Sequence, residues 1–458
     1  MKDPIKAFNS IKDALIRYVE TAFGTCSPSF EKERRNLLEA EGNKGSIFQE
    51  QYIEPIPDYP KDGKISDLIA SDLPELDLDA QNAFKNICKA GLFPEGFELF
   101  EHQKEMLRKS LSGKHCVITT GTGSGKTESF LLPLFASIIK EAGAWERVQN
   151  KLLNKCWGQT RKNGEKIIRG WNFDKRVDTW GEVRSPAVRA MIIYPMNALV
   201  EDQLSRLRFA LDSDQVHQSY NSAQDFWKGN KITFARYNGE TPIAGHPFKS
   251  NGDDNKGKQD KLRECLSDIE DTFVNLKQQL DVARRNQDHS KIKEIENLIT
   301  FFPRVDDAAA EMIHRWEIQR RSPDILITNF SMLSIMLMRH ENSNLEGDQA
   351  DENIFEKTKA WLESDPALKI NPNKPTRHFH LIVDELHLYR GTSGTEVSYL
   401  IRLLINRLGL SPSSPQLKIL ASSASLDKKS VQTKEFLCQF FGLETSQFDK
   451  FEVISGKP

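Results

Sequence analysis

The sequence lacks any run of about 18 apolar residues, which is the length that a helix needs to cross a bilayer. Its first twenty residues, MKDPIKAFNSIKDALIRYVE, alternate charged with apolar side chains and contain no continuous apolar stretch of the kind found in signal peptides. From these absences we expect a protein that neither spans a membrane nor is exported. They predict a cytoplasmic chain with no membrane partner.

An excess of charge of one sign is also missing, because 63 basic residues face 65 acidic ones. Any anionic partner must therefore be met by a local basic surface. The cysteines form no CxxC pair, which argues against both a zinc knuckle and a disulfide framework and predicts reduced thiols. They are Cys26, Cys88, Cys116, Cys156, Cys265 and Cys438.

The organisation of the chain changes near residue 96. Residues 1–95 have a mainly helical pattern, broken by a polar, proline-bearing stretch at 52–64, and are expected to form an accessory domain. Residues 96–458 alternate short apolar runs with helical segments, which predicts an α/β domain with a mostly parallel sheet. The expected strands are Cys116–Thr120, Ala190–Tyr194, Ile232–Tyr237, Ile325–Thr328, Phe379–Asp384 and Lys418–Ser422.

Two insertions are expected in this domain, at about 143–188 and 245–321. The first is basic and contains Trp157, Trp171 and Trp180, which would either bind a single strand by charge and stacking or pack the insertion onto the domain. The second has apolar residues at helical-seam spacing, which predicts a helical hairpin. Such a pair usually buries only its own seam, and a DNA-separating or partner-binding arm is the alternative. The seam residues are Leu262, Leu266, Ile269, Phe273, Leu276 and Leu280.

A glycine-rich segment joins an expected strand to an expected helix, which is the context of a phosphate-binding loop. Glycines let successive N–H groups point at phosphates, and the helix N-terminus adds partial positive charge. Lys126 is expected to neutralise the β- and γ-phosphates, and Thr127 to offer its hydroxyl to Mg²⁺. The candidate ATP-binding residues of the loop are Thr120, Gly121, Thr122, Gly123, Ser124, Gly125, Lys126 and Thr127.

A second anchor is the segment 380–387, HLIVDELH, in which an apolar strand ends in adjacent carboxylates. Asp384 is expected to hold Mg²⁺, and Glu385 to polarise the water that attacks the γ-phosphate. An acidic strand end by itself is more often a solvated cap. Together with the phosphate loop, the pair predicts a catalytic site made of Lys126, Asp384 and Glu385.

With these two anchors, the chain resembles the superfamily 2 DEAD/DEAH-box helicases over about residues 96–456. The phosphate loop departs from the strict pattern at Thr120, where that pattern has glycine, and the family usually has a small residue there. The other motifs are present in the family's order. ELFEHQK (98–104) lies upstream of the phosphate loop, and YPMNALVEDQ (194–203), GETP (239–242), ITN (327–329) and SAS (423–425) lie downstream of it.

The resemblance implies roles for further residues. Gln103 would contact the adenine. Residues on the loops after three strands would grip a nucleic-acid strand by its backbone, namely Pro195, Asn197, Gly239, Thr328 and Asn329. His387, Ser423 and Ser425 would couple hydrolysis to strand movement, with His387 bridging the nucleotide site to a partner domain. The alternative for the strand-end residues is that they belong to ordinary sheet-edge loops.

Segments such as RAMIIYPMNALVEDQLSRLR and VDELHLYRGTSGTEVSYLIRLL are most similar to large bacterial helicases of the MrfA type and of phage-defence systems. This implies a RecA-like P-loop fold, ATP and Mg²⁺ as cofactors, DNA as partner with RNA not excluded, and a role in bacterial DNA repair or phage defence.

The family takes its transition-state arginines from a second RecA-like domain, and no second set of βαβ units follows here. The chain is therefore expected to bind ATP better than it hydrolyses it. The alternatives are a nucleotide-switched nucleic-acid-binding subunit without turnover and a non-helicase ATPase that acts on proteins.

Overall fold

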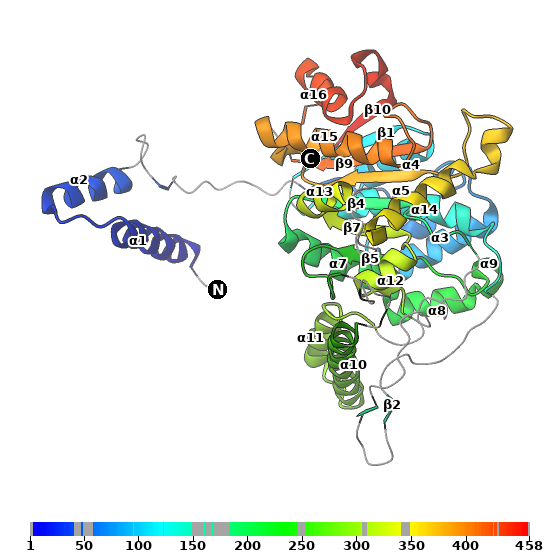
Figure 1. The fold of residues 1–458 in the computed structure, drawn as a ribbon, viewed down its shortest axis with the longest axis horizontal. Helices are drawn as coiled ribbons and strands as arrows, with labels where there is room; N and C mark the ends of the chain where they lie inside the picture. Colours follow the sequence, from blue (N-terminus) through cyan, green and yellow to red (C-terminus); the bar gives the residue numbers. More distant parts are fainter. Residues whose placement is uncertain are drawn as a thin grey trace. The chain divides into compact units, whose positions relative to one another are not determined.

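The computed structural model describes residues 3–40, 47–48, 58–94, 96–121, 123–148, 159–160, 166–167, 184–245, 249, 253, 255–304, 309–339, 349–389, 391–424, 426–427 and 430–456. The chain divides into two compact units, Met1–Pro57 and Asp58–Pro458. Figure 1 shows the elements of both units. Within the described residues, no helix is long and apolar enough to cross a membrane.

The first unit contains two helices, α1 (Pro4–Ala22) and α2 (Pro28–Glu39). Asp3 caps α1 by accepting hydrogen bonds from the backbone N–H groups of Ile5 and Lys6, and Pro4 suits the first helical turn. Ile16 is the one buried residue in these two helices. The two helices therefore contribute little buried core in the described part of this unit.

The second unit is built on an eight-stranded sheet in the order β10-β1-β9-β8-β4-β7-β5-β6, in which every pairing is parallel. All six predicted strands are present, with ends that differ by at most two residues, and β10 and β6 are two further strands at the opposite edges of the sheet. The strands are β1 (His115–Thr119), β4 (Ala190–Tyr194), β5 (Phe234–Tyr237), β6 (Glu311–Met312), β7 (Ile325–Asn329), β8 (Phe379–Val383), β9 (Leu417–Ser423) and β10 (Phe451–Ser455).

Alternate side chains of each strand enter two separate cores, one on each face of the sheet. In β1, for example, Ile118 belongs to one core and Val117 to the other. The helices of the first face are α3 (Leu78–Gly91), α4 (Glu101–Leu111), α5 (Lys126–Ala142), α7 (Asn197–Asp212), α8 (Asp214–Ser222) and α9 (Gln224–Trp227). Those of the second are α12 (Arg315–Arg320), α13 (Phe330–Met338), α14 (Gln349–Glu363), α15 (Gly391–Arg407) and α16 (Val431–Phe441). The predicted α/β fold with a parallel sheet is confirmed.

The division between the units differs from the boundary expected near residue 95. Ile65, Leu73 and Phe84 are buried in the core of the first sheet face. Gly91 lets α3 approach α7 closely, because a Cβ at this position would collide with the backbone of Ala210. Residues 58–94 therefore pack as part of the α/β unit, although their helical sequence pattern resembles that of residues 4–39.

The second insertion forms the predicted helical hairpin, made of α10 (Lys256–Arg285) and α11 (His289–Ile299), which lie side by side in Figure 1. Leu262, Leu266 and Phe273 pack with Trp316 of the α/β body, while Leu280 packs against Ile295 within the hairpin. One half of the seam thus anchors the hairpin, and the other half holds its two helices together. Most of the first insertion, including Trp157, Trp171 and Trp180, lies outside the described residues.

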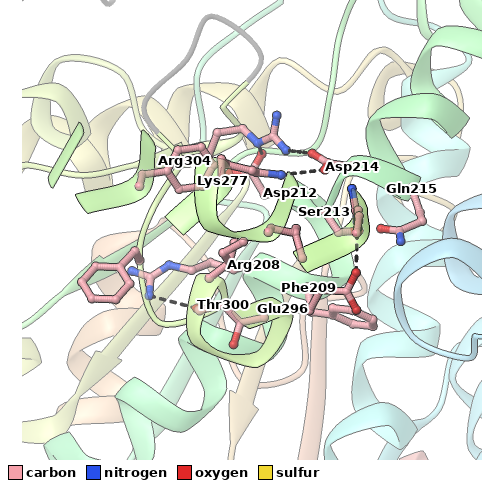
Figure 2. A pocket seen from close by; sticks show the side chains of 15 residues that line it. Arg208, Phe209, Asp212, Ser213, Asp214, Gln215, Lys277, Glu296, Thr300 and Arg304 are labelled. Atoms are coloured by element: carbon pink, nitrogen blue, oxygen red, sulfur yellow. Dashed lines mark hydrogen bonds and ion pairs between the residues drawn. The ribbon is translucent and has the colours of Figure 1, made fainter. Parts of the chain in front are cut away.

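A cavity of about 100 Å³ lies where the hairpin meets the corner between α7 and α8 (Figure 2). Lys277 of α10 forms an ion pair of 2.6 Å with Asp214, and Arg304 pairs with the same carboxylate. Arg208 of α7 is bound in two-point fashion by Glu311, at 2.6 and 2.9 Å. The ion pairs of Lys277 and Arg304 with Asp214 join the hairpin to the α/β body, and Arg208 also donates to the carbonyl oxygens of Thr300 and Phe301 at the end of α11.

Candidate functional site

The predicted site segments come together at the carboxyl ends of the parallel strands, where ligands of open α/β sheets bind. β1, β9 and β8 are neighbours, so the phosphate loop, the Ser-Ala-Ser segment and the acidic box share one end of the sheet. β4, β7 and β5 follow on the other side and carry the remaining motifs. The order of the strands therefore divides this carboxyl end of the sheet, called the sheet edge below, into a candidate nucleotide side at β1, β9 and β8 and a candidate nucleic-acid side at β4, β7 and β5.

The loop between β1 and α5 is the candidate phosphate-binding loop, and two of its glycines have positive φ angles. Gly123 and Gly125 have φ angles of 75° and 69°, a left-handed conformation that glycine adopts without strain. The hydroxyl of Ser124 donates to the carbonyl oxygen of Gly121 at 2.8 Å and lies 2.6 Å from Thr120 Oγ1, whose own proton it can accept. These contacts fold the loop back on itself ahead of Lys126, the first residue of α5. Thr122 lies outside the described residues.

Two side chains from the start of α4 contact the backbone of this loop. Gln103 donates to the carbonyl oxygen of Gly125 at 3.1 Å and accepts from the N–H of Phe100 at 3.0 Å. His102 Nε2 lies 2.8 Å from the carbonyl oxygen of Ser124. Both ends of the Gln103 amide are thus engaged within the protein, so the structure gives this residue a role in supporting the loop. The adenine contact expected for it stays a prediction.

Tyr59 is a third support, which the sequence did not indicate. Its hydroxyl accepts a hydrogen bond of 2.9 Å from the N–H of Gly121. Its ring lies edge-on to Phe100 and His102, with centroid distances of 6.1 and 5.3 Å. Tyr59 is 7% exposed and precedes α4 by more than forty residues, so no local pattern connected it with the loop.

The acidic box lies opposite the lysine of the phosphate loop. Lys126 Nζ is 3.3 Å from Glu385 Oε1, and both side chains are mostly buried. Glu385 has a φ of 51°, a left-handed conformation that is uncommon for a residue with a side chain and that often marks a functional site. Two motifs separated by more than 250 residues therefore meet at one point, and the catalytic roles expected of them stay a prediction.

Asp384 is buried beside Glu385 and is held by Ser422 of β9. Burial raises the pKa of Asp384, the neighbouring Glu385 charge adds to the rise, and the hydrogen bond from the Ser422 hydroxyl opposes it. The Ser422 hydroxyl donates to Asp384 Oδ1 and accepts from the N–H of Glu385 at 3.1 Å. Ser422, one residue before the predicted Ser423, therefore contacts the box through its hydroxyl. Ser423 is buried, and Ser425 lies outside the described residues.

His387 connects the box with the end of β9. Its Nδ1 lies 3.2 Å from Glu385 Oε2 and 3.3 Å from the backbone nitrogen of Ala424. An unprotonated Nδ1 accepts from the Ala424 N–H, whereas a protonated one donates to Glu385, so the two contacts exclude each other. The bridge from His387 to a partner domain stays a prediction.

On the candidate nucleic-acid side, the strand-end residues differ in their access to solvent. Asn197 is exposed and Pro195 is half-buried at the carboxyl end of β4, and Gly239 follows β5. Thr328 is fully buried, and its hydroxyl donates to the carbonyl oxygen of Tyr237 at 2.7 Å. Thr328 therefore supports the loop after β5, and the structure does not bring it to the surface. Asn329 is 8% exposed and caps α13.

A metal would find oxygen ligands in this site, since Thr127 and Asp384 both offer the hard donors that Mg²⁺ prefers. Among the described residues, no group of three or more His, Cys, Asp or Glu side chains could hold a metal by itself. The residues present therefore fit an ion that takes most of its ligands from phosphate oxygens and water.

Comparison with known proteins agrees with this geometry. Residues 100–235 match the family model of the DEAD/DEAH box helicases. The chain is 29% identical to Druantia protein DruE of Escherichia coli (strain UMEA 4076-1), over 98% of this chain and 22% of that protein. The chain thus spans less than a quarter of the length of this relative.

Solved structures of the DUF1998 helicase MrfA bound to DNA, and bound to DNA and AMPPNP, are also similar. Each is 17% identical with a TM-score of 0.37, and they cover 83% and 84% of this chain and 30% of the MrfA chain. The family match rests on residues 100–235, which include the phosphate loop, the whole of β4 and the first two residues of β5. Residues 100–235 of this chain are therefore similar to a DEAD/DEAH box helicase domain.

Proposed function

We propose that this chain is the ATP-binding half of an ATP-dependent DNA helicase or translocase. The observation that supports the proposal is the contact of 3.3 Å between Lys126, the lysine expected to bind phosphate, and Glu385, the expected catalytic base. Positioning and charge stabilisation account for most of the catalysis in phosphoryl transfer. A bound γ-phosphate would lie where these two side chains now meet.

In this proposal, Thr127 and Asp384 hold Mg²⁺, which neutralises charge on the phosphate oxygens when it is bound. Lys126 leaves Glu385 and binds the β- and γ-phosphates. Glu385 then accepts the proton of the attacking water. Ser422 holds the Asp384 side chain and the Glu385 backbone in fixed positions relative to each other, because its hydroxyl contacts both.

The other half of the motor is a second RecA-like domain, either in the same full-length protein or in a partner subunit. It would supply the transition-state arginine, whose removal commonly lowers turnover by about 10³–10⁵-fold. The motif-bearing segments support a role in bacterial DNA repair or phage defence. The nucleic-acid side of the sheet edge would grip one strand by its backbone, with DNA as the proposed partner.

Replacing Lys126 with alanine tests the nucleotide site. We expect the affinity for a fluorescent ATP analogue to fall by about ten- to one-hundred-fold, because charge-assisted hydrogen bonds to phosphate are lost. Lys140→Ala is the matched control on the same helix, since Lys140 pairs with Glu75 and lies away from the loop. Equal affinity in the wild type and Lys126→Ala would contradict the proposal.

Nucleic-acid binding is the second arm of this test. Salt-sensitive binding of a labelled oligonucleotide by the wild-type chain supports the motor, and comparison of DNA with RNA identifies the partner. ATP binding without turnover, even when a second motor domain is supplied, would favour the nucleotide-switched binding subunit. Nucleotide binding with no affinity for either nucleic acid would favour an ATPase that acts on proteins.

Replacing Tyr59 with phenylalanine tests the support of the phosphate loop. The change leaves the buried ring in place but removes the acceptor of the Gly121 N–H, so we expect nucleotide affinity to fall by about three- to ten-fold. The same fluorescent titration measures it. Tyr399→Phe, on the exposed surface of α15, should leave the affinity unchanged. An unchanged Tyr59→Phe affinity would show that the hydrogen bond has no part in nucleotide binding.

A further inference from the structure

Three asparagines from three different strand ends meet on the nucleic-acid side of the sheet edge. Asn197 begins α7 after β4, Asn238 follows β5, and Asn329 is the last residue of β7. The side-chain nitrogen of Asn238 lies 3.4 Å from Asn197 Oδ1, and that of Asn329 donates to the same oxygen. One carbonyl oxygen therefore receives hydrogen bonds from two carboxamides.

The orientation of both donor amides is fixed by backbone groups. Asn238 Oδ1 accepts from the N–H of Glu240 at 3.0 Å, and Asn329 Oδ1 accepts from the N–H of Met332 at 2.8 Å. Because each oxygen faces a backbone donor, each nitrogen is left to face Asn197. The Asn197 amide can accept from both of these nitrogens only with its Oδ1. Its Nδ2 must therefore point away from Asn238 and Asn329.

The burial of the three residues shows which of them can reach a ligand. Asn238 is fully buried and Asn329 is 8% exposed, whereas Asn197 is exposed. Within the described part of the chain, Asn197 Nδ2 donates no hydrogen bond. Its two N–H groups are thus held at the surface and are free to bind an acceptor.

The charges around Asn197 favour an anionic acceptor more than the sequence suggests. Glu201 and Glu240 lie on the flanking segments, but Arg236 pairs with both of them, at 3.7 Å in the case of Glu240. The guanidinium pairs with both carboxylates and offsets one of their two negative charges. A phosphate oxygen of a nucleic-acid strand therefore fits the Asn197 donors without facing an unpaired acid.

We infer that Asn238 is a positioning residue for nucleic-acid binding, which holds Asn197 with its Nδ2 turned outward to donate to a phosphate oxygen of a bound strand. This inference rests on the proposed function and adds to it a residue that is buried and cannot itself touch the strand. Because the donor is a neutral amide that meets the backbone, it gives affinity without reading sequence.

The test measures binding of a fluorescein-labelled oligo-dT strand to the full 458-residue chain by anisotropy. Asn197→Ala should bind about ten-fold more weakly, because a hydrogen bond to a charged group is lost. Asn197→Asp should lose about a further five-fold, since the two donors would hold one carboxylate oxygen and the other would face the phosphate. Asn221→Asp, an exposed change on α8, is the matched control and should bind as the wild type does.

Asn238→Asp separates positioning from general support of the fold. The N–H of Glu240 would hold one carboxylate oxygen, and the other would attract Asn197 Nδ2 in competition with the hydrogen bond from Asn329, so that the outward orientation of Nδ2 is weakened. We expect about a ten-fold loss in the wild-type background and no further loss in Asn197→Ala. Nucleotide affinity should not change. Asn238→Ala repeats this double-mutant cycle with a neutral side chain. We expect it to lower the affinity for the strand by about three-fold in the wild-type background and not at all in Asn197→Ala.

The outcomes are distinguishable. A wild-type chain that shows no salt-sensitive binding would overturn the proposed function. Wild-type binding that is unaffected in Asn197→Ala would overturn the inference alone, and so would a loss from Asn238→Asp or Asn238→Ala that persists in the Asn197→Ala background. Equal binding of Asn197→Asp and Asn197→Ala would show that the amide is not held in the stated orientation, whether or not the Asn238 variants fold.

Discussion

Replacing Glu385 by glutamine is expected to lower single-turnover ATP hydrolysis by about 10²–10⁴-fold while ATP binding is retained. The amide keeps the size and shape of the side chain but cannot accept the proton of the attacking water. Lys126 now pairs with this carboxylate at 3.3 Å and must release it when phosphate binds. The change removes that competition, so ATP affinity should stay equal or rise slightly, since partly exposed ion pairs contribute little.

The measurement uses protein in excess over radiolabelled ATP, with nucleic acid present, so that slow turnover is detected. Glu396→Gln, on the exposed side of α15, is the control for the chemical change and should hydrolyse at the wild-type rate. Hydrolysis that continues unchanged in Glu385→Gln would show that another group activates the water. A loss of turnover together with a loss of ATP binding would show that Glu385 supports the site instead of acting as its base.

The left-handed conformation of Glu385 explains why this one residue can face both Lys126 and His387. The chain turns sharply out of β8, so that Asp384 stays buried against Ser422 while the next carboxylate points across the site. The φ of 51° is unfavourable for a residue with a Cβ, and it is held by the Ser422 hydroxyl on the Glu385 N–H. Adjacent residues in sequence thereby acquire different surroundings and different expected roles.

The sequence predicted the strands and the anchors of the site because each is a local pattern. β1 and β8 are continuous apolar runs followed at once by glycines or carboxylates, and the hairpin of α10 and α11 follows from its seam spacing. β6 was not predicted because two residues at a sheet edge carry no periodic signal. Residues 58–94 were separated from the motor because helical periodicity does not tell which body a helix packs against.

The supporting residues of the site could not be predicted for a different reason. Ser422 contacts Asp384 because β9 and β8 are neighbours with Ala421 opposite Val383, and pairing register is not visible in a single strand. Tyr59 reaches the phosphate loop from a distant segment. Asn238 lies next to the predicted Gly239, yet its role depends on amides that arrive from β4 and β7. In each case, the missing information is a contact between segments far apart in sequence.

The amino ends of the strands, away from the site, contain a buried ion cluster whose loss is expected to affect stability and not chemistry. Asp324 precedes β7, is 1% exposed, and binds Arg184 at 2.7 and 2.8 Å and Arg189 at 2.8 Å. It also accepts from the N–H of Thr233 at 2.7 Å. Burial alone would raise its pKa, but the charges of the two arginines outweigh burial and lower the pKa below the ordinary value of 3.8.

Asp324→Asn should therefore lower the free energy of unfolding of the Asp58–Pro458 unit by about 3–5 kcal/mol, because two buried guanidinium groups lose their shared carboxylate. Urea unfolding at neutral pH measures the loss, and Glu98→Gln, which removes an exposed partner of Lys61, is the control with an expected change below about 1 kcal/mol. Because the folded pKa of Asp324 is lowered, its contribution is present above pH 3.8 and is lost as the pH falls through the folded value, so the difference from wild type should shrink there. A loss as small as that of Glu98→Gln would show that Glu141, which also binds Arg189, is sufficient to hold this end of the sheet.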